Sequence, residues 1–114
     1  MKVNLPNPSD ENALESIQID KWDTWSMDYT LSLLIVPMLK QLKEDSHGYP
    51  ATLNSFEEWQ GILDKMIWSF EQAKNEYEGC YGLALNNNEE YKAYMNQIQQ
   101  GFDLFGKYYM SLWD

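Results

Sequence analysis

The stretch that decides the fold is SFEEWQGILDKMIWSFEQAKNEY, residues 55–77. Ser55, followed by Glu58 three residues later, forms a capping-box pattern, which is typical of a helix N-terminus. Apolar side chains then recur every three or four residues, which indicates a helix with one buried face. We expect this helix to end at Gly79 and Gly82. The predicted buried face contains Trp59, Leu63, Met66, Ile67, Phe70 and Tyr77.

A second helix is predicted on the N-terminal side, over residues 24–44. Asp23 or Ser26 is placed to cap its start. Pro37 lies inside the pattern and is expected to kink or split the helix, because it removes the hydrogen bond to the Leu33 carbonyl. The three-four spacing assigns one buried stripe to Met27, Leu31, Leu34, Ile35, Met38 and Leu42.

A third helix is predicted to start near Asn87 or Asn88. Gly101 and Gly106 weaken it, because each glycine costs about 1 kcal/mol relative to alanine inside a helix. Such small residues either let another helix approach closely or mark a bend. The predicted buried stripe consists of Tyr91, Tyr94, Ile98, Phe102, Phe105, Tyr109 and Leu112.

Together these segments predict an all-α fold, an antiparallel three-helix bundle. Residues 1–20 are rich in Asn, Pro, Ser and acids, and we expect them to form a mobile arm with at most a short extended piece. Residues 21–114 then form a single helical domain. Because so small a domain buries limited surface, we expect a homodimer or larger oligomer. Its interface would use aromatics of the third helix, including Tyr108 and Trp113.

The composition excludes several classes of function. The net charge is −10, from 18 acids against 8 lysines, and the sequence contains no arginine. A nucleic-acid-binding protein needs a basic surface, and a bidentate phosphate clamp needs arginine. The single cysteine fits a reducing cytoplasm. The longest apolar run, LLIVPML at residues 33–39, is too short to cross a bilayer, so we expect a soluble intracellular protein without membrane contact.

DSHGYP, residues 45–50, contains the one histidine of the sequence, His47. Gly48 and Pro50 after the last periodic turn are typical of a helix stop. In that interpretation His47 interacts with the helix dipole and Tyr49 folds back on the core. The alternative is a binding loop, and the helix stop is the favoured reading.

Two aspartates lie at the borders of apolar stripes, Asp28 on the first helix and Asp64 on the second. Border carboxylates usually pair with tyrosine or lysine, but they also serve as acid–base groups. Trp25, beside Asp28, either packs over the bundle end or forms an aromatic wall suited to a base, a sugar or a cationic group. Our hypothesis is a shared pocket, in which Asp28, Asp64, His47 and Tyr49 contact a ligand between Trp25 and Trp59.

No motif points to a metal or a cofactor. One histidine and one cysteine exclude ordinary zinc sites, and the Glu-x-x-His pair of a di-iron bundle is absent from the sequence. There is no glycine-rich phosphate loop and no G-x-S-x-G turn. We therefore expect a non-enzymatic protein without cofactors; an enzyme using Asp28 and Asp64 is the least favoured reading.

The words WDTWSMDYTL, HGYP, EEWQGILDKMIWSFE and GFDLFGKYYMSLWD, in that order, resemble a family of small uncharacterised proteins of tailed phages. The resemblance covers roughly residues 20–114. It implies a viral protein that acts in the cytoplasm of an infected bacterium, and it supplies no activity. The shared words include Trp25, Asp28, His47, Gly48, Pro50, Trp59, Asp64 and Lys65.

Two functions follow as hypotheses. The first is a phage accessory protein that binds and neutralises a host protein, such as a defence component, because an acidic surface with aromatic anchors can occupy a basic channel. The alternative is a protein that sequesters a small nucleotide signal, with a pocket near residues 22–28 and 47–50. The absence of arginine counts against a highly phosphorylated ligand.

Overall fold

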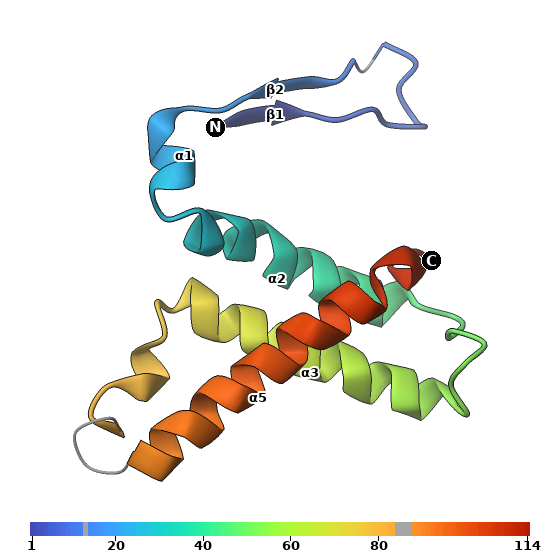
Figure 1. Cartoon of the computed structure of the whole chain (residues 1–114). Coiled ribbons are helices and arrows are strands. Elements are labelled where there is room, and N and C mark those ends of the chain that lie inside the picture. The colour runs from blue at the N-terminus through green and yellow to red at the C-terminus, as the bar shows by residue number, and fades with distance from the viewer. Residues whose placement is uncertain (13, 84–87) are drawn as a thin grey trace.

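The computed structural model describes residues 1–12, 14–83 and 88–114, and it is mainly helical, which confirms the predicted class (Figure 1). One expected helix start, Asn87, lies outside the described residues. The long helices are α2 (Met27–Asp45), α3 (Phe56–Lys74) and α5 (Asn88–Lys107). The short ones are α1 (Lys21–Trp25), η1 (Glu78–Cys80) and η2 (Tyr109–Ser111).

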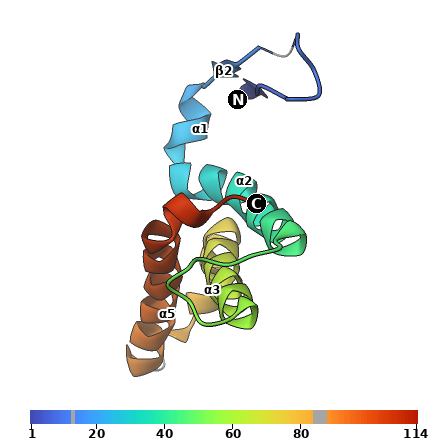
Figure 2. The same cartoon turned by 90° about the vertical axis from the view of Figure 1, so that its right-hand side faces the viewer.

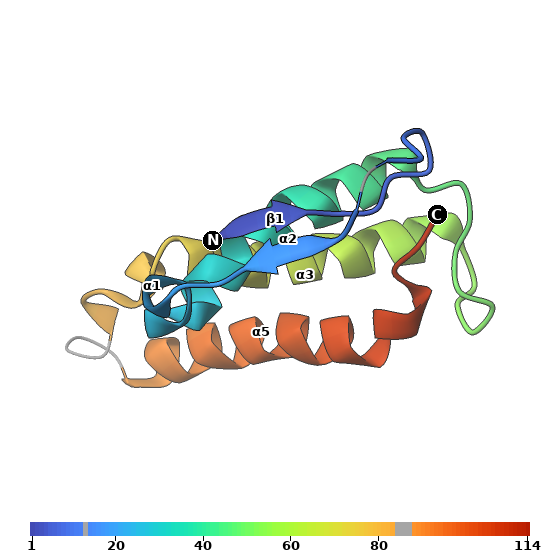
Figure 3. The same cartoon turned by 90° about the horizontal axis from the view of Figure 1, so that it is seen from above.

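Helix α3 is the centre of the fold, because both α2 and α5 pack against it (Figures 1 and 3). A groove lies between α2 and α5. All three long helices nevertheless contribute to one core cluster, because Ile35 and Leu42 of α2 and Leu104 and Phe105 of α5 pack against it. The principal core follows α3 and consists of Leu39, Leu53, Trp59, Leu63, Met66, Ile67 and Tyr108.

The predicted buried face of α3 is confirmed from Trp59 to Ile67, and Phe70 is half-buried. Its cap is confirmed in part. The Ser55 hydroxyl accepts a hydrogen bond from the Glu58 backbone N–H at 3.1 Å, but the Glu58 carboxylate accepts from the Asn54 N–H rather than from Ser55.

Helix α3 ends earlier than the glycines suggested. It stops at Lys74, and Glu76 and Tyr77 both adopt a left-handed backbone with φ of 57°. The Tyr77 N–H donates to the Gln72 carbonyl at 2.8 Å, which satisfies one of the last helical acceptors. The chain therefore turns before Gly79 is reached.

The buried stripe predicted for α2 is wrong in part, since of its six residues only Ile35 and Leu42 pack against the core, where they are half-buried. Met27, Leu31, Leu34 and Met38 are exposed, while α2 packs on α3 through a different face. Residues 31–39 are apolar almost all round the helix, so spacing alone does not say which face is inside. The side chains that α2 buries are Ser32, Val36 and Leu39.

The start of this region also differs from the prediction. A separate helix, α1, is capped by Asp20, whose side chain accepts from the Trp22 N–H at 2.8 Å, while Asp23 accepts from the Asp20 N–H. Ser26 separates α1 from α2, and its side chain makes no capping hydrogen bond. Pro37, in contrast, does not split α2, and its exposed position leaves water free to reach the backbone there.

Gly101 lies at a close contact between α3 and α5. It is buried, and a Cβ on it would lie 2.6 Å from the Lys65 carbonyl oxygen and against the Ser69 side chain. Of the two roles predicted for the glycines, close approach is therefore correct for Gly101. A Cβ on Gly106 would meet nothing within 4 Å. Along the predicted α5 stripe Ile98 is buried, whereas Tyr109 lies beyond the helix and is exposed.

The N-terminal arm contains a hairpin of two antiparallel strands, β1 (Lys2–Asn4) and β2 (Ser16–Gln18). Within the described residues, strand structure is confined to this arm, as predicted, although it forms a paired hairpin instead of one extended piece. Figures 1 and 2 show the hairpin standing away from the bundle, to which α1 connects it.

Candidate functional site

The HGYP loop begins where Ser46 ends α2. The Ser46 N–H donates to the Leu42 carbonyl at 2.9 Å, and the Ser46 hydroxyl donates to the same oxygen at 2.6 Å. Ser46 therefore terminates α2, not His47 or Gly48. Tyr49 remains exposed and does not fold back on the core as the helix-stop interpretation expected; Leu53, further along the loop, is buried there instead.

Gly48→Ala is expected to leave the free energy of unfolding unchanged or to raise it by up to about 1 kcal/mol. Gly48 is not among the residues with positive φ, and a Cβ there would meet nothing within 4 Å. Alanine would then mainly restrict the unfolded chain. Chemical denaturation checks this: a loss above about 1 kcal/mol would mean that Gly48 is a structural requirement.

A pocket of about 440 Å³ lies between this loop, the first turn of α3 and the chain after η2. Figure 1 shows the loop and the C-terminal end of the chain at the same end of the molecule. We call it the HGYP pocket. The residues that define it are His47, Gly48, Tyr49, Pro50, Trp59, Trp113 and Asp114, together with Ser46 and Ser111.

The walls of the HGYP pocket are aromatic, and its polar groups converge at one place. The Asp114 Oδ1 lies 3.4 Å from the His47 Nδ1. Trp113 and Tyr49 are exposed, whereas Trp59 is buried and packs edge-to-face on Tyr108 with 5.6 Å between ring centroids. Aromatic faces beside a carboxylate suit a cationic group, which both attract.

The structure brings together three of the six predicted site residues, His47, Tyr49 and Trp59. It adds Trp113 and Asp114, which the sequence reasoning did not place in the site. The sequence feature that could have indicated them is an aromatic residue followed by an acidic one, directly after the apolar stripe of the last helix. Sequence alone could not show that η2 turns this segment back to a loop more than 60 residues earlier.

Asp28 and Trp25 lie at the other end of α2. Asp28 accepts a hydrogen bond from the Tyr77 hydroxyl at 3.2 Å; burial raises the pKa of Tyr77, and the Asp28 carboxylate raises it further. Trp25 is exposed on α1, with its ring 5.7 Å from that of Trp22. His47 follows Asp28 by 19 residues, and at a rise of about 1.5 Å per residue this corresponds to about 28 Å along the axis of α2. One small ligand therefore does not contact both residues.

Asp64 forms an ion pair with Lys43 at 2.6 Å and borders a small cavity of about 180 Å³ beside Trp68. Lys43 lies about 22 Å along α2 from Asp28. Asp28 therefore pairs with Tyr77 and Asp64 with Lys43, as is usual for carboxylates at the border of an apolar stripe. The two do not face one substrate, and Asp64 does not line the HGYP pocket.

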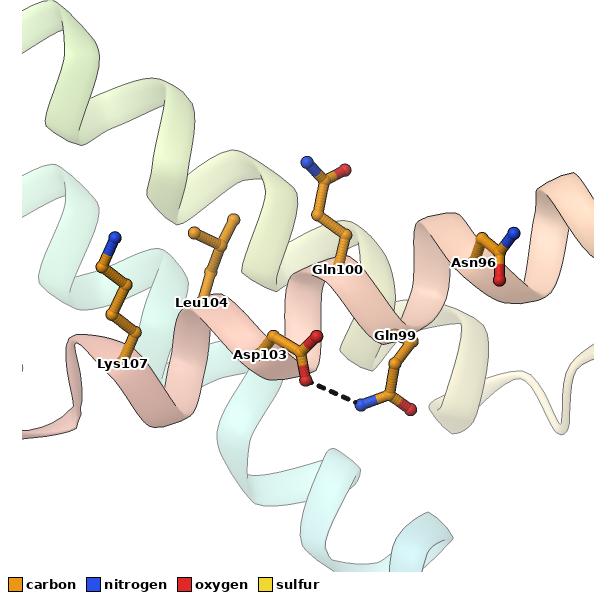
Figure 4. Close-up of a pocket in the computed structure, with 6 residues that line it drawn as sticks. All are labelled: Asn96, Gln99, Gln100, Asp103, Leu104 and Lys107. Atoms are coloured by element: carbon orange, nitrogen blue, oxygen red, sulfur yellow. Dashed lines mark hydrogen bonds between the residues drawn. The ribbon is translucent and has the colours of Figure 1, made fainter.

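Two further hollows lie on the bundle. One, about 340 Å³, runs along the outer face of α5, where Gln99 donates to Asp103 at 2.9 Å (Figure 4). All of its lining residues belong to one helix, so no second element supplies groups that converge on a ligand. The other is a groove of about 840 Å³ in the open seam between α2 and α5, lined mainly by apolar side chains.

Over the described ranges no three His, Cys, Asp or Glu side chains gather closely enough to hold a metal ion, and no helix is long and apolar enough to cross a membrane. Comparison of the chain with protein-family models, with curated protein sequences and with solved structures gave no significant match.

Proposed function

We propose that this chain is a non-enzymatic phage accessory protein that binds and neutralises a host protein, such as a defence component, in the cytoplasm of the infected bacterium. The observation that carries the proposal is the HGYP pocket, whose exposed Trp113 and Tyr49 stand beside the Asp114 carboxylate. A lysine or arginine side chain of the partner would fit between these groups. The net charge of −10 would steer a basic partner toward the pocket.

The alternative, a pocket for a nucleotide signal, has one observation in its favour. The volume of about 440 Å³ falls in the range of small-molecule sites, and aromatic walls can stack on a base. The charge opposes it, because the residues that line the pocket include the acidic Asp114 and no lysine or arginine. A phosphate would be repelled by that carboxylate.

The test compares two variants of the pocket with a matched control. The protein is used to capture partners from infected cells, and the recovered host protein is then titrated against purified variants. Asp114→Asn should weaken binding about 10–100-fold, because it removes the charge from one charge-assisted contact. Trp113→Ala should weaken it by at least about fivefold, since it removes an aromatic anchor.

Trp22→Ala is the control, because Trp22 is also an exposed tryptophan but lies on α1, outside the pocket. Raising the salt concentration should weaken the complex, as attraction between opposite charges is screened. Equal affinities for Trp113→Ala and Trp22→Ala would contradict the proposal. Release of a nucleotide from the purified protein, lost in Trp113→Ala, would favour the alternative.

A further inference from the structure

Helix α2 exposes a row of large apolar side chains. Met27, Leu31, Leu34 and Met38 follow a four-three-four spacing and form one continuous stripe, which we call the α2 stripe. Each is more than two-fifths exposed, and Met38 reaches 67%. A helix that is apolar all round is normally covered on every side. Here α3 covers one side of α2, and the stripe has no cover within the described part of the chain.

The α2 stripe continues into the open seam of the bundle. Leu31 and Met38 also line the groove of about 840 Å³ between α2 and α5. The opposite wall comes from Phe105 and Tyr109, and the floor from Leu39. Contiguous apolar surface of this kind marks a binding site for another protein surface.

The hairpin has an apolar face of its own. Val3 stands opposite Ile17 in the register, and residues two positions away along each strand share their face. That face carries the exposed apolar residues Met1, Val3, Leu5, Ile17 and Ile19 together with the exposed Glu15, while Lys2, Asn4, Ser16 and Gln18 occupy the other face. A lone two-stranded hairpin is marginally stable in water, so this amphipathic hairpin needs a surface to pack on.

The molecule has more surface than a compact monomer of its size. Its accessible area is 8429 Å², whereas a compact 13.5 kDa protein exposes about 6,500 Å². Its radius of gyration is 16.8 Å, against about 13 Å for a compact chain of this length. The surplus of about 1,900 Å² is the amount that one subunit of an obligate homodimer buries.

We propose that a second copy of this chain covers these surfaces. The two copies associate through their α2 stripes, and the arm of each lays the apolar face of its hairpin on the bundle of the other. The α2 stripe itself contains no charged residue, so two chains of charge −10 can meet along it without opposing carboxylates. Glu15 on the hairpin face and Asp45 and Asp114 in the groove are the acids nearest to the contact. A stripe with alternating three and four spacing is also self-complementary in a two-fold pair.

This interface differs from the one predicted from the third helix. Tyr108 is buried inside its own subunit against Trp59, so it is not free to join a partner. The HGYP pocket shares Asp114 with the groove, but its aromatic residues do not line the groove, and the dimer does not depend on the proposed function. The effect of salt distinguishes the dimer from the proposed host complex. Raising the salt concentration should tighten the dimer, because it screens repulsion between like-charged chains, and should weaken a complex with a basic host protein.

The test is the mass in solution at tens of micromolar, measured by light scattering, with the expected mass twice that of one chain. Met38→Glu in the stripe and Ile17→Glu on the hairpin face should each weaken dimerisation at least about 30-fold, the scale of an interface hot spot. Both positions are exposed, so each variant should keep the melting profile of a folded bundle.

Matched controls are available for both changes. Met110 is 90% exposed on η2, outside the stripe, and Gln18 lies on the opposite face of the hairpin from Ile17. Met110→Glu and Gln18→Glu should leave the dimer intact. A monomer mass for the unchanged protein, a dimer that dissociates as salt is raised, or equal weakening by test and control variants would each overturn the proposal.

Discussion

Gly101→Ala is expected to lower the melting temperature by about 4–12 °C, although alanine favours helices. The new Cβ would stand 2.6 Å from the Lys65 carbonyl oxygen, which belongs to the α3 backbone, and against the fully buried Ser69. Neither group has room to move, so α5 must shift away from α3. Overpacking of this kind costs about 1–3 kcal/mol, and each kcal/mol corresponds to about 4 °C for a domain of this size.

Gly106→Ala is the matched control, because it makes the same chemical change in the same helix. A Cβ at Gly106 meets nothing within 4 Å, so the substitution gains helix propensity of up to about 1 kcal/mol without a clash. The melting temperatures of the two variants, measured by circular dichroism, should therefore shift in opposite directions relative to that of the unchanged protein. A rise in melting temperature for both would show that α3 and α5 are not in close contact at Gly101.

The two glycines illustrate what the sequence could and could not predict. Both were recognised as weak points of α5, but only the crossing with α3 decides which one is required. The same holds for the helices: α3 could be oriented from spacing because its polar residues occupy the other side. α2 could not, because it is apolar on nearly every side: Ser32, Val36 and Leu39 are buried, while equally apolar residues such as Leu31 and Leu34 are exposed.

The candidate site was predictable to a similar degree. His47 and Tyr49 are adjacent to Trp59 because a short loop joins α2 to α3, and such local proximity can be inferred from the sequence. Asp28 and Asp64 looked equivalent as border acids, yet their partners, Tyr77 and Lys43, are set by how the helices pack. The contribution of the chain after η2 depends on the same packing.

Trp59→Ala is expected to destabilise the protein by about 3–5 kcal/mol, the usual cost of removing a large buried aromatic side chain. Trp59 is only 3% exposed, lies in the core and packs on Tyr108. The melting temperature should fall by about 12–20 °C. Trp59, predicted as a wall of the ligand site, therefore serves first as a core residue on which the pocket is built.

Trp113→Ala provides the comparison, since Trp113 belongs to the same pocket but is 76% exposed. Its loss should change stability by no more than about 0.5 kcal/mol. Thermal unfolding of both variants should thus show that the protein needs Trp59 for stability, whereas Trp113 is free to contact a partner. Similar melting temperatures for the two would mean that Trp59 is not held in the core, and that the pocket floor is free to rearrange when a partner binds.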